Sequence, residues 1–382
     1  MSNSGVLGAW VAKDSERFST GRYEMFYSCS PGSDASSAEP SAVVASSGHR
    51  AFTVDLHCHM FVPAAAEAVA GAFDMETDGL HRFSSEASRQ VNARQADTIQ
   101  EQLVLVERRL ADMDQMGIDV QALSPVPLQY YYALEPDLGR TAVRLINDEI
   151  ATVVEAHPDR FVGLAGLPMQ DPEMAVSELD RVVKELGFRG IELSTNVNGD
   201  ELSNSRFNNV FAKAEELDIL ILLHPNGFSD GRRLQDHYFI NVIGNPLDST
   251  VAVSHLIFDG VLDRYPGLKI CVVHGGGYLP AYSGRIDHAH AAREDSRRCI
   301  KEPPTSYLRK LYFDTVVFTE HQLEYLVGLY GSDHIVLGTD YPFDMGMYDP
   351  VGFVDGTAAL TKSDKEAIVG GNAARLLKIS PP

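Results

Sequence analysis

The feature that most constrains this sequence is a repeated alternation of short apolar stretches and longer amphipathic ones. Nearly every apolar stretch precedes a segment with helical spacing, a pattern typical of parallel strands joined by crossover helices. Eight such units close a (β/α)8 barrel, so the sequence predicts the α/β class and a TIM-type barrel. A doubly wound sheet is the alternative, but no Gly-x-Gly-x-x-Gly turn follows the first strand. The eight expected strands are 52–59, 119–126, 161–167, 190–194, 219–224, 269–274, 311–316 and 335–338.

Parts of the chain lie outside this repeat. Residues 1–48 are a predicted N-terminal extension, much of it with the Ser-, Ala-, Gly- and Pro-rich composition of a linker. Aromatic side chains near its start indicate that it is partly ordered. The barrel domain is expected over residues 49–382, with a small insertion after strand one at about 62–100. Residues 74–98 are expected to be irregular, and residues 99–116 to form one amphipathic helix.

Composition excludes several classes of function. The formal net charge of -21 is opposite in sign to the surface that nucleic acid requires. No apolar run reaches the ~20 residues that span a bilayer, and the start of the chain lacks the pattern of a secretory signal. Four scattered cysteines form no paired motif, which is typical of a reduced, cytoplasmic protein.

The first expected strand ends in the sequence Val-Asp-Leu-His-Cys-His, which contains His57 and His59. Side chains two residues apart on a strand face the same side, so the two imidazoles are expected to point together. Paired imidazoles are suited to a divalent metal. Taken alone, the motif also fits a solvated strand end with two incidental histidines.

Further polar residues stand at the ends of later strands, where a (β/α)8 barrel carries its chemistry. His224 ends the fifth strand, and Asp340 follows the eighth. Together with His57 and His59 they form a predicted site for Zn2+, with Mn2+ also possible, and Asp340 is counted as catalytic as well. His274 ends the sixth strand before three glycines, and we expect it to be a general acid/base, although a fifth metal ligand is the alternative.

Three further acids and a run of tyrosines are not predicted to be catalytic. Asp314 at the seventh strand and Glu192 at the fourth are assigned no catalytic role, and Asp55 is expected to support the ligands or the fold. The tyrosines at 130–132 are expected to pack on the barrel rim rather than line the pocket.

The motifs also carry a resemblance to a known family. In chain order they are His-x-His, His-Pro, His-Gly-Gly-Gly and Gly-Thr-Asp-Tyr-Pro-Phe, with an Asp-Met-Asp segment at 112–114. This set resembles the decarboxylase branch of the amidohydrolase superfamily, and most of all its carboxymuconate-semialdehyde decarboxylases, over residues 54–377. The resemblance implies a distorted barrel with one zinc, the same four metal ligands, and His274 as the acid/base.

The substrate-binding residues depart from the family pattern. The resemblance implies two arginines that clamp an acidic substrate, one of them donated across a dimer interface. That arginine matches Arg285, eleven residues after the catalytic histidine. The other falls near Gln100, so Arg94 is the nearest candidate, and Asn226 stands where the family has an aromatic residue. Surface charges are the alternative for both arginines.

These observations favour a metal-dependent, non-oxidative decarboxylase of an unsaturated or aromatic carboxylic acid, similar to a carboxymuconate semialdehyde or a hydroxybenzoate. The same site also suits a hydrolase acting on a C–C, C–N or lactone bond, or a hydratase, because fold does not decide reaction. A metal-stabilised binding protein is disfavoured, because structural zinc prefers closed, thiolate-rich sites. The expected partners are a small carboxylic acid and further copies of the chain in a homodimer or higher oligomer.

Overall fold

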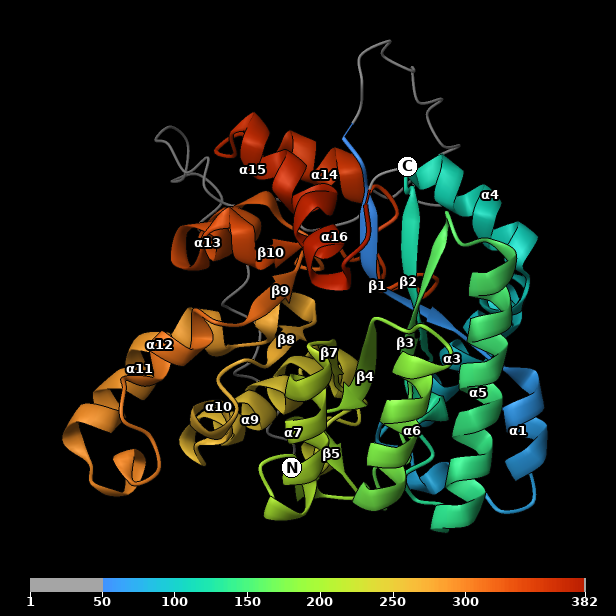
Figure 1. Cartoon of the computed structure of the whole chain (residues 1–382), viewed down its shortest axis with the longest axis horizontal. Coiled ribbons are helices and arrows are strands. Elements are labelled where there is room, and N and C mark those ends of the chain that lie inside the picture. Colours follow the sequence, from blue (N-terminus) through green and yellow to red (C-terminus); the bar gives the residue numbers. More distant parts are fainter. Residues whose placement is uncertain (1–50, 381–382) are drawn as a thin grey trace, which may run out of the picture. The chain divides into compact units, whose positions relative to one another are not determined.

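A computed structural model describes residues 51–380, and its central element is a sheet of eight parallel strands (Figure 1). The predicted extension at residues 1–48 lies outside the described residues. Along the sheet the strands follow chain order, as consecutive β/α units require. They are β1 (Val54–Met60), β2 (Val120–Pro125), β3 (Phe161–Ala165), β4 (Gly190–Ser194), β7 (Leu220–His224), β8 (Lys269–Val272), β9 (Tyr312–Asp314) and β10 (Ile335–Val336).

The first strand meets the end of the last, so that the sheet forms a nearly closed barrel. The amide of Leu56 donates to the carbonyl oxygen of Leu337 at 2.9 Å, and the amide of His59 donates to that of Tyr341 at 2.9 Å. Cys58 forms an isolated parallel bridge with Tyr341. An open doubly wound sheet would lack these contacts, and the predicted (β/α)8 barrel is confirmed.

Helices surround the barrel and connect its strands (Figure 1). The main crossover helices are α5 (Pro136–Ala156), α6 (Pro172–Lys184), α7 (Asn208–Leu217), α9 (Gly244–Phe258), α11 (Leu279–Ala292) and α13 (Glu320–Tyr330). Shorter helices are α8 (Phe239–Val242), α10 (Val261–Arg264), α12 (Pro304–Leu308), α14 (Pro350–Gly356), α15 (Lys362–Glu366) and α16 (Asn372–Leu377). A hairpin of β5 (Asn196–Val197) and β6 (Asp200–Glu201) follows β4.

Apolar side chains fill one end of the barrel interior. One buried cluster joins residues of six strands, including Val54 on β1 and Leu220 on β7, with Leu376 and Leu377 of α16. Strands so far apart in the sheet can share a cluster only inside the barrel. Val54 and Leu220 are the first residues of their strands and share the cluster with α16, so α16 covers the end at which strands begin, and the opposite end remains for polar chemistry.

Strand β1 presents two consecutive residues to the interior. Its pairing with β2 is irregular between Asp55 and Cys58. Leu56 belongs to the interior cluster, and the ring of the next residue, His57, lies 5.0 Å from that of His224. A regular strand would direct neighbouring side chains to opposite faces. The irregularity allows β1 to fill the core with Leu56 and then to present His57 and His59 at the site.

The segment between β1 and β2 is more helical than expected. It contains α1 (Pro63–Val69), α2 (Gly79–Arg82), α3 (Glu86–Val104) and α4 (Val106–Met116). The expectation of irregular structure at 74–98 was wrong, because α3 is a polar helix with only two buried residues and shows no apolar stripe. The single helix expected at 99–116 is two helices, separated at the extended residue Leu105.

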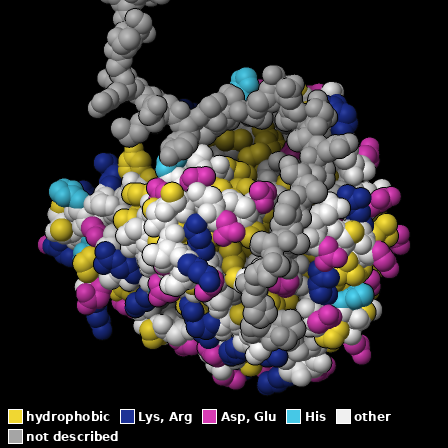
Figure 2. Space-filling view, turned by 90° about the horizontal axis from the view of Figure 1, so that it is seen from above, with side chains coloured by type: hydrophobic (Ala, Val, Ile, Leu, Met, Phe, Trp, Pro, Cys, Tyr) yellow, Lys and Arg dark blue, Asp and Glu magenta, His cyan; other side chains and the backbone are white. Residues whose placement is uncertain are grey.

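The surface carries charges of both signs. On the face shown in Figure 2, basic and acidic side chains are interspersed. The described side chains visible on that face do not form the continuous basic surface that a phosphate backbone requires. Among residues 51–380, no helix combines the length and the apolar character needed to cross a bilayer.

Candidate metal centre

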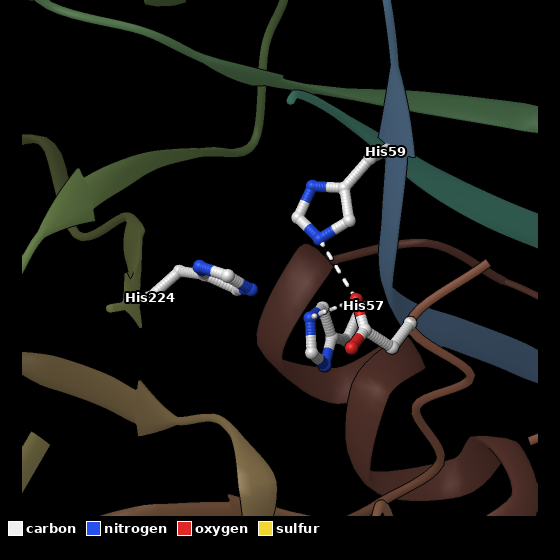
Figure 3. A group of neighbouring side chains, drawn as sticks. His57, His59 and His224 are labelled. Atoms are coloured by element: carbon white, nitrogen blue, oxygen red, sulfur yellow. Dashed lines mark ion pairs between the residues drawn. The ribbon is translucent and has the colours of Figure 1, made fainter. Parts of the chain in front are cut away.

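Four buried side chains converge where the barrel strands end. His57 and His59 project from β1, His224 ends β7, and Asp340 follows β10. One possible ligand atom from each of the four lies within 4.8 Å of the others. Figure 3 shows the three labelled imidazoles directed toward a common space. The structure thus brings together the four residues that the sequence predicts as metal ligands.

The chemistry of this set suits a divalent cation. Nε2 of His57, Nε2 of His59 and both ring nitrogens of His224 are buried without a hydrogen-bond partner among the described residues. Buried polar atoms rarely lack a partner unless they serve a function. Three imidazoles and one carboxylate form a mixed nitrogen and oxygen set, and a cation with five or more coordination positions bound there would also accept water or substrate. A metal site is therefore indicated here.

The charges in the cluster are strongly coupled. Asp340 Oδ1 lies 3.4 Å from His57 Nε2 and 3.2 Å from His59 Nε2. Burial alone would lower the pKa of His57, but the carboxylates of Asp340 and Asp314 raise it to about 10. Burial would raise the pKa of Asp340, yet the imidazoles, His57 above all, hold it well below its usual value. Burial and the neighbouring imidazoles lower the pKa of His224. The cluster thus holds buried negative charge that a divalent cation can neutralise.

Two acceptors orient the imidazoles of β1. His57 Nδ1 lies 2.7 Å from Asp314 Oδ2, and His59 Nδ1 lies 3.1 Å from the carbonyl oxygen of Pro125. When each Nδ1 donates its proton to these acceptors, each Nε2 keeps a lone pair for a cation. From the sequence alone, Asp314 was assigned no catalytic role. The available signal was an acid at the end of the seventh barrel strand.

His274 lies beside the four residues. Its Nε2 is 3.4 Å from Asp340 Oδ2, and its ring centroid is 5.2 Å from those of His57 and His224. Its φ of 55° is in the left-handed region, where a non-glycine residue is strained. Such strain is common where a side chain must be held for function, and the role of His274 as an acid/base stays a prediction.

The three glycines after His274 are required by its surroundings. Gly275, Gly276 and Gly277 have φ values of 61°, 82° and 67°. A Cβ at Gly276 would lie 2.5 Å from the ring of Phe313, and one at Gly277 would lie 2.3 Å from a backbone carbonyl oxygen. The amide of Gly275 donates to Asp314 Oδ1 at 2.8 Å. Asp314 therefore holds both His57 and the turn that carries His274.

A second buried acid lies on the other side of the cluster. Glu192 on β4 is fully buried, and its Oε1 accepts a 2.6 Å hydrogen bond from the hydroxyl of Tyr130. Its Oε2 lies 3.8 Å from His59 Nδ1. Burial raises the pKa of Glu192. Tyr130 stacks on Tyr132, with ring centroids 5.6 Å apart. The tyrosines do pack in a loop as expected, but Tyr130 also reaches the neighbourhood of the ligands.

The three residues predicted to bind substrate are placed differently from one another. Arg285 is exposed on α11 and Arg94 is exposed on α3, and neither guanidinium forms a hydrogen bond or ion pair with another described residue. Asn226, two residues after His224, donates from Nδ2 to Asp78 Oδ2 at 2.6 Å. Asp78 is buried at the start of α2. Asn226 thus ties the insertion to the loop that follows a predicted ligand.

Comparison with known proteins agrees with this architecture. The amidohydrolase family model matches residues 54–379. Among curated proteins, 2-amino-3-carboxymuconate-6-semialdehyde decarboxylase of Dictyostelium discoideum is 32% identical over 87% of this chain and 93% of its own length.

Solved structures of decarboxylases share the fold. The 5-carboxyvanillate decarboxylase of Sphingomonas paucimobilis is 26% identical with a TM-score of 0.78, covering 87% of this chain and 100% of that one. The dihydroxybenzoic acid decarboxylase of Polaromonas sp. JS666 contains bound manganese. It is also 26% identical, has a TM-score of 0.74, and covers 86% of this chain and 97% of its own. This chain, with its barrel and its cluster of histidines and aspartate, belongs to the amidohydrolase family.

Proposed function

We propose that this chain is a metal-dependent carboxy-lyase that releases CO2 from a small unsaturated or aromatic carboxylic acid. The observation that carries the proposal is the position of His274 beside, but not within, the group of four possible ligands. A purely structural metal site needs no such additional imidazole. Named decarboxylases among the relatives of known structure and sequence support the same reaction class.

The reaction requires two events at one carbon. The bond between this carbon and the carboxylate breaks, and the carboxylate leaves as CO2. A proton binds to the carbon in its place, so that the acid anion and one proton become CO2 and the protonated product. A divalent cation bound at the cluster would supply positive charge for the electrons that the departing CO2 leaves behind. His274 would donate the proton, because an imidazole exchanges protons near neutral pH.

The chain holds His274 in place for this transfer. Asp340 Oδ2 is 3.4 Å from its Nε2, and the glycine turn after it is bound to Asp314. Nδ1 of His274 is buried without a hydrogen-bond partner among the described residues. The imidazole is therefore constrained by its backbone on one side, and its Nδ1 is not engaged by another described residue.

For the metal, zinc is the proposal and manganese the alternative. Three imidazole nitrogens favour zinc over the hard cations calcium and magnesium, which prefer oxygen ligands. The manganese found in a related decarboxylase supports the alternative. Metal analysis of the purified protein distinguishes the two.

For the substrate, the proposal is an acidic molecule with a second anionic group, bound by an arginine of another copy of the chain. Arg285 has no partner among the described residues, and Tyr282, one turn before it on α11, is 69% exposed. A bidentate guanidinium recognises a carboxylate well. A homodimer in which α11 faces the partner would place Arg285 in this role, and Arg94 is the second candidate.

Two further proposals concern the chain as a whole. We place it in the cytoplasm, since its cysteines form no paired motif. We also propose that the barrel domain starts near residue 49 and that residues 1–48 are a separate extension, since the family match begins at residue 54.

The test uses heavy water and a His274→Ala variant. Turnover in D2O should place one deuterium on the carbon that carried the carboxylate, detected by mass spectrometry of the product. His274→Ala should keep its metal and lose at least about 100-fold in kcat, the usual contribution of general acid catalysis. Substrate consumed with incorporation of 18O from labelled water and without CO2 would instead establish the hydrolase or hydratase alternative.

A further inference from the structure

Arg109 on α4 is a buried arginine that forms no ion pair within the described part of the chain. Only 2% of its surface is exposed. Its guanidinium is surrounded by neutral acceptors: Nη1 donates to Gln121 Oε1 at 3.1 Å, and Nη2 donates to the carbonyl oxygens of His59 and Gln102. Burial of a cation without a carboxylate partner is costly, so the arrangement calls for a specific reason.

One face of the same guanidinium covers Tyr341. The Arg109 Cζ lies 4.9 Å from the centroid of the Tyr341 ring. The Tyr341 hydroxyl donates to Asp112 Oδ2 at 2.7 Å, one turn further along α4. Tyr341 directly follows the predicted ligand Asp340, whose φ of 57° is unusual for a non-glycine residue. Helix α4 thus holds the ligand segment after β10 through both the ring and the hydroxyl of Tyr341.

A hydrogen-bond chain extends this contact to the start of the site. Gln121 Nε2 donates to Asp55 Oδ2 at 2.9 Å, and Asp55 Oδ1 accepts from the amide of His57 at 3.2 Å. The hydroxyl of Thr339 donates to Asp55 Oδ2 at 2.7 Å, and its amide donates to Asp55 Oδ1 at 3.1 Å. From Arg109 the network therefore reaches the backbone of His57 and His59 on β1 and the backbone of Thr339, the residue before Asp340.

We propose that Arg109 is a positioning residue that sets the geometry of three metal ligands: His57, His59 and Asp340. The proposal rests on the metal centre proposed above. It follows because Arg109 joins the two segments that carry these ligands, while the fourth ligand, His224, lies on β7 outside the network. A planar fork of five donors is unique to arginine, and no other side chain can bond two carbonyls and an amide while it stacks on a ring.

Metal affinity depends on such supporting contacts. Ligands must be held to within about 0.5 Å and 10–20° of their productive geometry. Loss of a residue that orients metal ligands typically weakens metal binding by about 10–100-fold. Loss of Arg109 should therefore weaken metal binding and alter ligand geometry on the β1 and β10 side, beyond any loss of general stability.

The test compares Arg109→Met with Arg140→Met, in the full-length protein. Methionine keeps much of the length and apolar packing of arginine but has no donor. Arg140 on α5 is the matched control, because it is the same residue type, its side chain is 43% exposed, and its ion pair is with Asp137 on the same helix. The dissociation constant for Zn2+ is measured by competition with a chromophoric chelator. The visible absorption spectrum of the Co2+-loaded protein reports coordination geometry directly.

Arg109→Met is expected to bind Zn2+ about 10–100-fold more weakly and to show a changed Co2+ spectrum, whereas Arg140→Met stays within about twofold of the native protein. If Arg109→Met does not fold, Arg109→Lys replaces it. Lysine keeps the charge and one donor, and should show a smaller change in the same direction. A folded variant at Arg109 with native Zn2+ affinity and native Co2+ spectrum would overturn the proposal. Failure of the native protein to bind either metal would instead overturn the proposed metal centre itself, and with it this role for Arg109.

Discussion

Asp314→Asn is the substitution with the most specific expected consequence. Asp314 Oδ2 accepts from His57 Nδ1 at 2.7 Å, and Oδ1 accepts from the amides of Gly275 and Val316 at 2.8 Å and 3.2 Å. Asparagine has one acceptor oxygen, which is expected to stay with the two backbone amides. Its NH2 group then faces His57 Nδ1, and two donors cannot bond to each other.

The imidazole of His57 must therefore change its proton arrangement. If Nδ1 becomes an acceptor for the asparagine NH2, the ring proton moves to Nε2, the atom that faces the cluster (Figure 3). A protonated Nε2 cannot ligate a metal. A buried hydrogen bond to a charged group contributes about 1.5–3 kcal/mol, and each 1.4 kcal/mol corresponds to about tenfold in affinity. Binding of Zn2+ should weaken by about 10–100-fold, in agreement with other residues that orient ligands.

The assay is chelator competition for Zn2+, with Asp97→Asn as the matched control. Asp97 is exposed on α3 and makes no contact with the site. The control should bind Zn2+ within about twofold of the native protein. A folded Asp314→Asn protein with native affinity would refute the assignment of Asp314 as the residue that orients His57.

Three further predictions follow from other contacts. Since the pKa of His57 is about 10 without metal, binding of Zn2+ should displace its proton. Affinity should then rise by about tenfold per pH unit near neutrality, and binding that leaves the pH of a weakly buffered solution unchanged would contradict this. Glu178→Ala should lower the free energy of unfolding, measured in urea, by roughly 2–4 kcal/mol. Glu178 is buried and accepts hydrogen bonds from two arginines and an asparagine. A loss below about 1 kcal/mol would contradict this stabilising role. Asn226→Ala should speed limited proteolysis of residues 70–85 by at least about tenfold, because its hydrogen bond to Asp78 contributes about 1.5 kcal/mol or more. An unchanged cleavage rate would rule out this anchoring role.

Much of the fold could be predicted because its signals are local. Each strand is a short apolar run followed by a helical period, and both properties are visible in single segments of sequence. The strand at 190–194 was predicted with the bounds that the structure has, and the strand at 219–224 differs by one residue at its start. The insertion was less predictable, since α3 buries only two residues and depends on a Ser85 cap rather than on an apolar stripe.

In the candidate site, too, some residues could be predicted from the sequence and others could not. His57, His59, His224 and Asp340 could be found because all four stand at strand ends, which a barrel gathers at one place. The contacts that support them depend on tertiary structure. Nothing in the sequence near Asp314 indicates that it lies 2.7 Å from His57, which is more than two hundred residues away.

The irregular pairing in β1 is a further example. From side-chain alternation alone, Asp55 and His57 would face the same side of the strand. The register change between Asp55 and Cys58 separates them. Asp55 then binds Gln121 on the side of α4, and His57 enters the barrel.

Whether the chain is a metal-dependent decarboxylase is decided by measuring the CO2 released by metal-loaded and metal-stripped protein. The panel of acids would include carboxymuconate semialdehydes and hydroxybenzoates, with released CO2 quantified against substrate consumed. We expect one CO2 per substrate with at least one of these acids, loss of that activity when the metal is removed, and recovery on addition of Zn2+ or Mn2+. Metal-loaded protein that converts a panel member without releasing CO2 would contradict this expectation, as would CO2 release that survives complete removal of the metal.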